Sequence, residues 1–361
     1  MALWKLDATE LAAGIKARRF SCREVMESVV ERIRAENPRL NAIVADLTEQ
    51  ALAEASAADS QEPTGPLHGV PVTIKINIDQ QGEATTNGLA LFRDLIAPAD
   101  SPVVRNLRRA GAIVVGRTNV PELSMRATTV NPLYGRTRNP WSEDASPGGS
   151  SGGGGAAAAA GLGAIHHGND IGGSLRFPAF ANGVVGLKPS PGRVAAYNPS
   201  ATAERSPLAQ LTSVQGPMAR SVADTALALR AMAMDDPRDP WWCPVPLEGP
   251  PVARPVKVAW ARETYGCPLH PEIGALLEQA ARHLTDAGYE VVEVKTPSLE
   301  EPQRGWFSVL ITELTASLGP ILEQHGSDDV RHIFGWYAEM GELLDDKAWR
   351  AGLADRRRKE R

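Results

Sequence analysis

The most unusual stretch of the sequence, residues 146–160, combines serines and glycines with a run of alanines. Within it, Gly148-x-Ser150-x-Gly152 matches the nucleophile elbow of α/β-hydrolases, in which an activated serine attacks a carbonyl carbon. That motif should follow a hydrophobic strand, but residues 141–145 are mostly polar. It also requires a histidine base, and the later histidines lie in ordinary helical sequence. The sequence therefore disfavours a hydrolase elbow of this type.

Three other interpretations of this stretch also fit poorly. A phosphate-binding Walker loop ends in Gly-Lys-Ser or Gly-Lys-Thr, which is absent from the sequence. Gly152-x-Gly154-x-x-Ala157 formally matches a dinucleotide fingerprint, but that motif follows a strand and this one follows polar residues. A flexible linker does not usually run into a strong alanine helix and then into a second compact Gly/Ser motif. The second motif decides how the first is interpreted.

That second motif, residues 169–178, reads Asn-Asp-Ile-Gly-Gly-Ser-Leu-Arg-Phe-Pro and contains Ser174. Upstream of both motifs, Lys75 ends a β-rich run that begins at Gly69. With these features in this order, the sequence resembles the amidase signature family over residues from about 10 to 350. The matching segments are 69–75, 131–137, 147–153, 170–178, 183–189 and 216–220. Chance supplies one such segment easily, but not six in register.

The resemblance implies a Ser-Ser-Lys mechanism of amide hydrolysis. In this family a neutral lysine, here Lys75, accepts a proton from Ser150, which takes one from Ser174 as Ser174 attacks the carbonyl. The acyl-enzyme on Ser174 is then hydrolysed, so a carboxamide yields an acid plus ammonia or an amine. Lysine is a base near neutral pH only if burial lowers its pKa, and the apolar residues among 70–78 favour burial. The family also has a cis peptide bond before the residue that matches Ser150.

The resemblance also assigns groups that bind the substrate. Ile171, Gly172 and Gly173, which precede Ser174, supply the oxyanion hole in this family. Glycines allow several backbone N–H groups to converge on one point. Ser124 falls where the family's backbone faces the bound substrate. The implied ligand is a small-molecule amide, and no metal or organic cofactor is implied.

Three further residues are expected to support the catalytic groups. Ser151, Asp170 and Arg176 match positions that hold the lysine and the loop in the family. The sequence departs from the family pattern at Ile76, where aspartate is frequent, and at Asn169, where serine or threonine is common. Neither is one of the three catalytic residues, so the departures indicate a subgroup. The sequence around them resembles stand-alone bacterial amidases of the indoleacetamide-hydrolase-like type.

The elements around these motifs predict an α/β fold. Ser21 and Glu24 form a capping box before a helical hydrophobic pattern, and Ser101-Pro102 begins another helix. Short β-rich segments alternate with helices, which favours one mixed, mainly parallel sheet with helices on both faces. The resemblance implies the amidase-signature fold. We expect a single domain, residues 1–361, made of N-terminal helices (1–60), a catalytic core (65–225), and a strand–helix–strand and helical region (250–361).

Composition indicates a soluble globular protein. The 361 residues carry a formal net charge of −5, with 43% hydrophobic and 22% charged residues. No block of one charge suggests nucleic acid, and no apolar run reaches the roughly 18 residues of a membrane span. Cys22, Cys243 and Cys267 lack metal-ligand spacing and indicate reduced thiols. Since the N-terminus is unlike a signal peptide, we expect a cytoplasmic enzyme, and we leave a homodimer open.

Two alternatives accompany the amidase hypothesis. The same triad occurs in glutamine amidotransferase-type subunits, which carry out transamidation with partner proteins. A catalytically impaired fragment is the other alternative, because the family continues well beyond residue 361 with further helices, strands and part of the substrate pocket. We therefore expect a chain that lacks the family's C-terminal part and is less stable and less active than a longer version. The sequence does not identify the particular amide.

Overall fold

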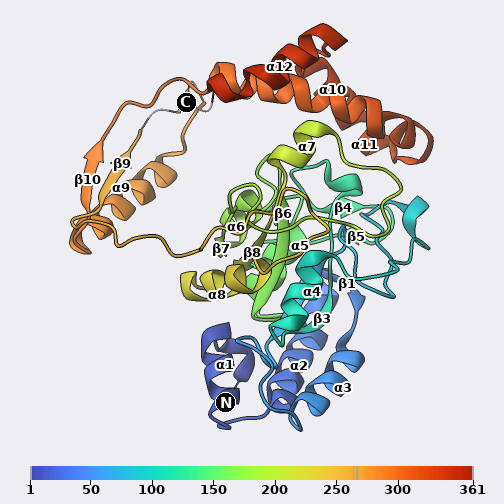
Figure 1. Ribbon diagram of the computed structural model, residues 1–361, viewed down its shortest axis with the longest axis vertical. Helices are drawn as coiled ribbons and strands as arrows, with labels where there is room; N and C mark the ends of the chain where they lie inside the picture. Colours follow the sequence, from blue (N-terminus) through green and yellow to red (C-terminus); the bar gives the residue numbers. More distant parts are fainter. Residues whose placement is uncertain (1, 263, 266, 360–361) are drawn as a thin grey trace. The chain divides into compact units, whose positions relative to one another are not determined.

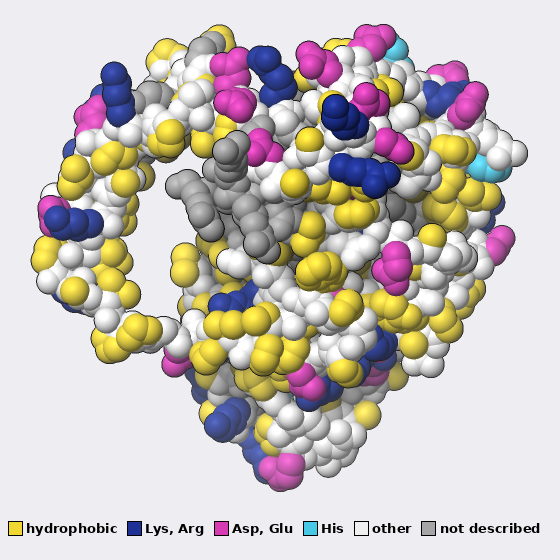
Figure 2. All heavy atoms as spheres, turned by 45° about the horizontal axis from the view of Figure 1, so that its top comes forward, with side chains coloured by type: hydrophobic (Ala, Val, Ile, Leu, Met, Phe, Trp, Pro, Cys, Tyr) yellow, Lys and Arg dark blue, Asp and Glu magenta, His cyan; other side chains and the backbone are white. Residues whose placement is uncertain are grey.

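The computed structural model describes residues 2–262, 264–265 and 267–359, with side chains described as far as residue 355. The chain forms two compact units, whose elements Figure 1 labels. They comprise Met1–Val245 with Glu313–Tyr337, and Pro246–Thr312 with Ala338–Arg361. All the residues assigned to the chemistry lie in the first unit. Figure 2 shows basic and acidic side chains interspersed among apolar ones on the face that it draws.

Among the described residues, a six-stranded sheet in the order β1–β3–β2–β6–β8–β7 lies at the centre of the first unit. Its strands are β1 (Ile43–Asp46), β2 (Pro71–Lys75), β3 (Ile113–Thr118), β6 (Ile165–Asp170), β7 (Val185–Gly186) and β8 (Val214–Ala219). A separate two-stranded sheet pairs β4 (Val130–Asn131) with β5 (Gly135–Arg136). The expected strands that contain Lys75 and residues 112–115 are therefore present.

The mixed central sheet confirms the predicted fold class, but its parallel part is narrower than expected. The pairs β2–β3 and β2–β6 are parallel, whereas β1–β3, β6–β8 and β7–β8 are antiparallel. Parallel strands require a crossover connection, and α4 (Pro102–Arg109) before β3 and α5 (Gly152–Ala160) before β6 provide it. The prediction of a mainly parallel sheet is therefore correct for the strands at the centre of the sheet and wrong for those at its edges.

Helices pack against several strands of this sheet. The capping box predicted at Ser21 is present: Ser21 Oγ accepts from the Glu24 N–H (3.0 Å), and Glu24 Oε2 accepts from the Ser21 N–H (2.7 Å). It begins a helix whose Val25, Val29 and Ile33 are buried. This helix is α2 (Cys22–Leu40). The remaining helical elements of this part of the chain are η1 (Leu3–Lys5), α1 (Ala8–Lys16), α3 (Thr48–Ala58), η2 (Ala90–Phe92), η3 (Glu122–Ser124), α6 (Arg176–Asn182), α7 (Pro207–Thr212) and α8 (Val222–Met232).

Helix α5 is built from the glycine- and alanine-rich stretch, which is therefore not a flexible linker. It packs against β2, β6 and β8, and almost all of it is buried. The glycines permit this close approach: a Cβ at Gly153 would lie 2.5 Å from the backbone nitrogen of Asn119. The helix thereby fixes Ser150 and Ser151, which precede its first turn, beside the ends of the central strands.

Helix α10 (Glu300–His325) and α11 (Asp328–Met340) each contribute residues to both units. Within the first unit, both carboxylate oxygens of Glu313 accept from the Leu208 N–H (3.0 and 3.2 Å). Of the described helices, α10 is the one long and apolar enough to cross a membrane by length and composition, and 33% of its most apolar window is buried. The sequence predicts no uninterrupted apolar run of that length, and the apolar part of α10 is interrupted by the buried Glu313. The core helix of a soluble protein meets the same criterion.

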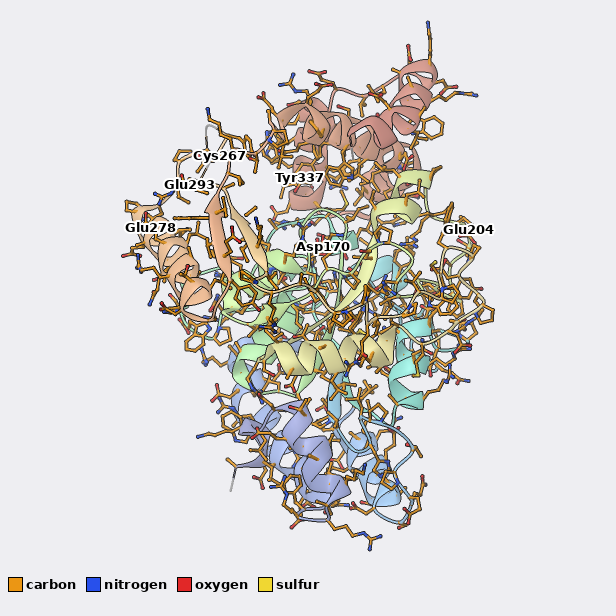
Figure 3. All side chains as sticks on the ribbon, turned by 60° about the vertical axis from the view of Figure 1, so that its left-hand side comes forward. Asp170, Glu204, Cys267, Glu278, Glu293 and Tyr337 are labelled. Carbon is orange, nitrogen blue, oxygen red and sulfur yellow. The ribbon has the colours of Figure 1, made fainter. Side chains whose placement is uncertain are left out.

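The second unit contains the strand–helix–strand arrangement predicted after residue 250. Strands β9 (Lys257–Trp260) and β10 (Glu290–Glu293) pair in parallel, and α9 (Pro271–Asp286) connects them. Arg262 forms ion pairs with Glu278 of α9 (3.1 Å) and with Glu293 of β10 (3.3 Å), both labelled in Figure 3. Helix α12 (Asp346–Lys359) also belongs to this unit.

Candidate active site

Lys75 is the last residue of β2 and is fully buried, with 0% of its surface exposed. Strand β2 is buried along its whole length because it lies between β3 and β6 at the centre of the sheet. The amine nitrogen Nζ lies 2.7 Å from Ser150 Oγ and 2.6 Å from Asn169 Oδ1. The sheet therefore places a buried amine in direct contact with one of the two predicted catalytic serines.

Burial lowers the pKa of Lys75 from 10.5 to about 7, and the carboxylate of Asp170 opposes part of this lowering. An ammonium group loses its hydration when it is buried, whereas a neutral amine loses much less. Every residue of β2 is buried and Lys75 has no exposed surface, so the amine is shielded from solvent. At neutral pH a large fraction of the amine is consequently unprotonated and able to accept a proton.

Ser150 and Ser151 lie between the glycine loop and α5. The Gly149–Ser150 peptide bond is cis, and Ser150 is buried, with 1% of its surface exposed. Ser151 Oγ accepts from the Asn169 N–H (3.4 Å) and donates to the Asn169 carbonyl (3.3 Å). The Ser151 N–H donates to the carbonyl of Ser174 (3.1 Å). The serine loop is thus bound to β6 and to the second motif through backbone groups.

Ser174 lies just before α6 and is half-buried. It follows Gly173, whose φ of +107° lies in a region that side chains disfavour and glycine adopts readily. Among the described residues, the hydroxyl of Ser174 forms no hydrogen bond with Ser150. Catalytic hydrogen bonds are often formed only when a substrate is bound. The contact between Lys75 and Ser150 is therefore in place, and the contact between the two serines is not.

Asp170, at the end of β6 and labelled in Figure 3, braces the loop that carries Ser174. Its carboxylate accepts from the backbone N–H groups of Gly173 (2.8 Å), Leu175 (3.1 Å) and Arg176 (3.3 Å) and from two side-chain nitrogens of Arg176 (both 3.0 Å). Burial alone would raise the pKa of this carboxyl, but hydrogen bonds from Arg176, Gly173 and Leu175 hold it below its ordinary value. Asp170 therefore remains ionised and fixes the loop.

The backbone N–H groups of the second motif divide into two sets. The Gly173 N–H donates to Asp170, so it serves the brace. In the described part of the chain, the N–H groups of Ile171, Gly172 and Ser174 donate to no protein acceptor. Gly172 is exposed and Ile171 is half-buried. Of the N–H groups expected near the oxyanion, those of Ile171 and Gly172 are therefore available to a ligand, as is that of Ser174, whereas the one from Gly173 is engaged.

Ser124 lies in a hydrogen-bonded loop between two asparagines. Its hydroxyl accepts from Asn77 Nδ2 (3.1 Å) and donates to Asn87 Oδ1 (2.9 Å). Sequence reasoning did not single out either asparagine. Asn77 carried no signal, because it lies in a turn after Lys75, where the alternation of a strand no longer predicts the direction of a side chain. Asn87 carried none, since only the folded loop brings it to this region.

Comparison with known proteins agrees with this geometry. A family model described as Amidase matches residues 24–334. The chain is 48% identical to an indoleacetamide hydrolase of Bradyrhizobium diazoefficiens, over 98% of this chain and 68% of that protein. It is 37% identical to one subunit of the glutamyl-tRNA(Gln) amidotransferase of Moorella thermoacetica, over 88% of this chain and 66% of that protein. A solved 6-aminohexanoate cyclic dimer hydrolase, complexed with substrate, matches with a TM-score of 0.84 and 28% identity, over 99% of this chain and 76% of that chain.

These matches identify the class of protein as an amidase; amidases are enzymes that hydrolyse amide C–N bonds. The chain belongs to the amidase family, as the resemblance predicted. It spans about two thirds of the length of the two curated relatives named above. The roles of Lys75, Ser150 and Ser174 stay predictions that the geometry supports and that experiments must test.

Proposed function

We propose that this chain hydrolyses the C–N bond of a small carboxamide, with Ser174 as nucleophile, Ser150 as proton relay and Lys75 as base. The observation that carries the proposal is the fully buried amine of Lys75, 2.7 Å from Ser150 Oγ. A buried amine with a pKa of about 7 is an unusual and costly feature that suits a base near neutral pH. No other described group close to Ser150 has this property.

The first half of the reaction forms an acyl-enzyme. Ser174 Oγ attacks the carbonyl carbon while its proton moves to Ser150 Oγ and the proton of Ser150 moves to Lys75 Nζ. The resulting oxyanion accepts hydrogen bonds from the free N–H groups of the second motif, each of which contributes about 3–4 kcal/mol of transition-state stabilisation in comparable sites. The C–N bond then breaks, and the leaving nitrogen takes the proton back from Lys75 through Ser150. Ammonia or an amine departs.

The second half of the reaction hydrolyses the ester on Ser174. Water attacks the acyl carbon and passes a proton along the same two groups to Lys75. Collapse of the second tetrahedral intermediate breaks the bond to Ser174 Oγ and returns that proton to it. The acid is released, and the enzyme regains its starting protonation.

For the substrate we propose a primary amide of an aryl-acetic acid. The support is the 48% identity to a protein named indoleacetamide hydrolase. Indoleacetamide is accordingly the first substrate to test, beside simple aliphatic and benzylic amides that lack the fused ring. Faster hydrolysis of the aliphatic amides than of indoleacetamide would overturn this assignment of substrate class while leaving the amidase reaction intact.

The test of the reaction is ammonia release by the purified chain together with labelling by a fluorophosphonate, followed by identification of the modified residue. We expect ammonia from an amide with no partner protein present, and one adduct, on Ser174. The Ser174→Ala variant is the control and should show neither. Glutamine hydrolysis that appears only with partner proteins would instead support the transamidation alternative. The 37% identity to an amidotransferase subunit is the reason to test that alternative.

A further inference from the structure

The amine of Lys75 has a second close partner besides Ser150. Asn169 Oδ1 lies 2.6 Å from Lys75 Nζ, at the position where the sequence departs from the serine or threonine of the family pattern. An amide oxygen only accepts hydrogen bonds. The contact therefore fixes one N–H of the amine toward Asn169, which leaves the nitrogen lone pair for the hydroxyl proton of Ser150.

A second asparagine determines which end of the Asn169 amide faces the lysine. Asn169 Nδ2 donates to Asn77 Oδ1 (2.9 Å), and Asn77 Nδ2 donates in return to Asn169 Oδ1 (3.3 Å). If the Asn169 amide rotated by half a turn, its NH₂ group would face two other donors, the Lys75 amine and the NH₂ group of Asn77. The reciprocal pair therefore holds the oxygen of Asn169, rather than its nitrogen, against Lys75.

The orientation of Asn77 is fixed in turn by the loop beyond it. Ser124 Oγ accepts from Asn77 Nδ2 (3.1 Å) and donates to Asn87 Oδ1 (2.9 Å). The two segments adopt left-handed backbone at Ser124 (φ 61°) and at Asn87 (φ 45°), conformations that are uncommon outside glycine and persist where the surroundings impose them. An uncharged hydrogen-bonded chain thus runs from Asn87 to the amine of Lys75.

We propose that Asn169, oriented by Asn77, is a positioning residue that holds the Lys75 amine in place while keeping it a base. The inference rests on the proposed function, because it assigns a role in the same proton relay. A neutral acceptor orients the neutral amine and continues to accept after the amine gains a proton. A carboxylate at the same place would bind the ammonium form strongly and remove the base. The role explains why an uncharged acceptor of fixed orientation faces Lys75.

The charged and titratable groups nearest to Lys75 lie on β6, and one further charge lies on β3. On β6, Asp170 is ionised and favours the ammonium form, while burial lowers the pKa of His167 to about 3, so it is neutral. His167 Nδ1 accepts from the backbone N–H of Lys75 (3.4 Å), and its Nε2 lies 2.8 Å from Gln215. On β3, the buried Arg117 is in register with Ile74, and its positive charge lowers the pKa of His167 further. Helix α5 contributes glycine and alanine only.

The decisive variant is Asn169→Asp, which changes the charge and almost nothing in the size of the side chain. An adjacent opposite charge raises the pKa of a buried amine, by about 1–3 units in typical cases. Because the reaction needs the neutral amine, the acid limb of kcat/KM should move to higher pH by that amount. Activity lost at pH 7 should return as the pH is raised. Asn37→Asp, the same change on α2, is the matched control and should leave the acid limb in place.

Two further variants separate positioning from general structure. Asn169→Leu removes the acceptor, so kcat should fall at every pH, and higher pH should not restore it. Asn169→Ser supplies a smaller uncharged acceptor and should recover part of the rate lost in Asn169→Leu. An acid limb that stays within about 0.3 pH units in Asn169→Asp, the usual error of such a fit, would overturn the proposal, given the shift expected from an adjacent charge.

A direct titration keeps this inference distinct from the proposed function. The ¹³Cε signal of Lys75, assigned with a Lys75→Arg variant, reports the pKa of the amine whether or not an amide is hydrolysed. A raised pKa in Asn169→Asp with no turnover by the wild-type chain would support the positioning contact and sink the proposed function. Turnover by the wild-type chain with an unchanged Lys75 pKa in Asn169→Asp would support the proposed function and overturn the positioning role of Asn169.

Discussion

Lys75 and Ser174 differ in every physical respect although the proposed mechanism makes them two ends of one proton relay. Lys75 is fully buried, and both of its close polar partners are fixed by hydrogen bonds or packing. Ser174 is half-buried, follows a glycine with positive φ, and is held mainly through the backbone groups around it. The base must be dry in order to be neutral at pH 7, whereas the nucleophile must be accessible to a substrate.

The two ends of the relay should therefore respond to different kinds of substitution. At the buried end, charge and packing determine function, because burial costs an ammonium group more desolvation free energy than it costs a neutral amine. At the accessible end, the presence of the hydroxyl and the placement of backbone N–H groups determine it. Variants at the two ends should therefore separate these two kinds of dependence.

Removal of the nucleophile should have the largest effect. Ser174→Ala eliminates the acyl-enzyme, and kcat should fall by roughly a millionfold, as it does when other serine hydrolases lose their serine. The measurement is initial-rate ammonia release together with mass spectrometry of fluorophosphonate-treated protein. Ser150→Ala should slow turnover strongly while leaving Ser174 able to form an adduct. An adduct on Ser150 in the wild-type chain would reverse the roles of the two serines.

Loss of the base should have the next largest effect. Lys75→Ala removes general-base catalysis, which contributes about 10²–10⁴-fold, so kcat at pH 8 should fall by that amount. In the wild-type chain the pKa of Lys75 is about 7, and the amine must be neutral to act. Activity should therefore decline as the pH falls through about 7, and this acid limb should be absent from the residual activity of the variant. A limb of unchanged shape in Lys75→Ala would assign it to another group.

A smaller effect is expected at Asp170, which belongs to both ends of the relay. Asp170→Asn weakens the brace to Arg176 and Leu175, and displacement of the Ser174 loop by about 1 Å would lower kcat on the order of 100-fold. The ionised carboxylate also raises the pKa of Lys75, so its loss should move the acid limb to lower pH. That direction is opposite to the one expected for Asn169→Asp. If the acid limb moved in the same direction in Asp170→Asn and in Asn169→Asp, charge would not be what sets the pKa of the Lys75 amine.

The sequence predicted those parts of the molecule that depend on local pattern or on the family motifs. The capping box at Ser21, the helix after Ser101 and the buried strand that ends at Lys75 are all present. The motifs placed Lys75 and Ser150 in one site, and the structure brings their side chains into contact. The cis peptide bond at Ser150, implied by the family, is also present.

The rest required the folded chain because it depends on distant segments. The antiparallel edges of the sheet arise from long loops whose direction no local pattern records. The amide pair joins Asn77 with Asn169, and the loop residues Ser124 and Asn87 complete it from two further segments. Asparagines are common at turns, so nothing in the sequence separates these from ordinary loop residues. Ser124 itself was assigned to substrate binding, which the structure leaves as a prediction.

The smallest expected effect concerns the packing that keeps the buried end rigid. Helix α5 directly follows Ser150 and Ser151 and lies close to the sheet because its first residues are glycines. A Cβ at Gly153 would lie 2.5 Å from the backbone nitrogen and 2.7 Å from the backbone oxygen of Asn119, neither of which can move alone. Gly153→Ala should therefore lower the free energy of unfolding by about 1–3 kcal/mol, the usual cost of overpacking, despite the better helix propensity of alanine.

The matched control for this change is a helical glycine in the same unit with open space around it. Gly335 lies in α11, is exposed, and a Cβ added there meets nothing within 4 Å. Gly335→Ala should raise the free energy of unfolding by up to about 1 kcal/mol through helix propensity alone. Urea unfolding of both variants measures the sign of each change in the free energy of unfolding. If Gly153→Ala stabilises the chain as Gly335→Ala does, the close approach of α5 to the sheet is not what holds Ser150 against Lys75, and the contrast between a rigid base and an accessible nucleophile loses its structural basis.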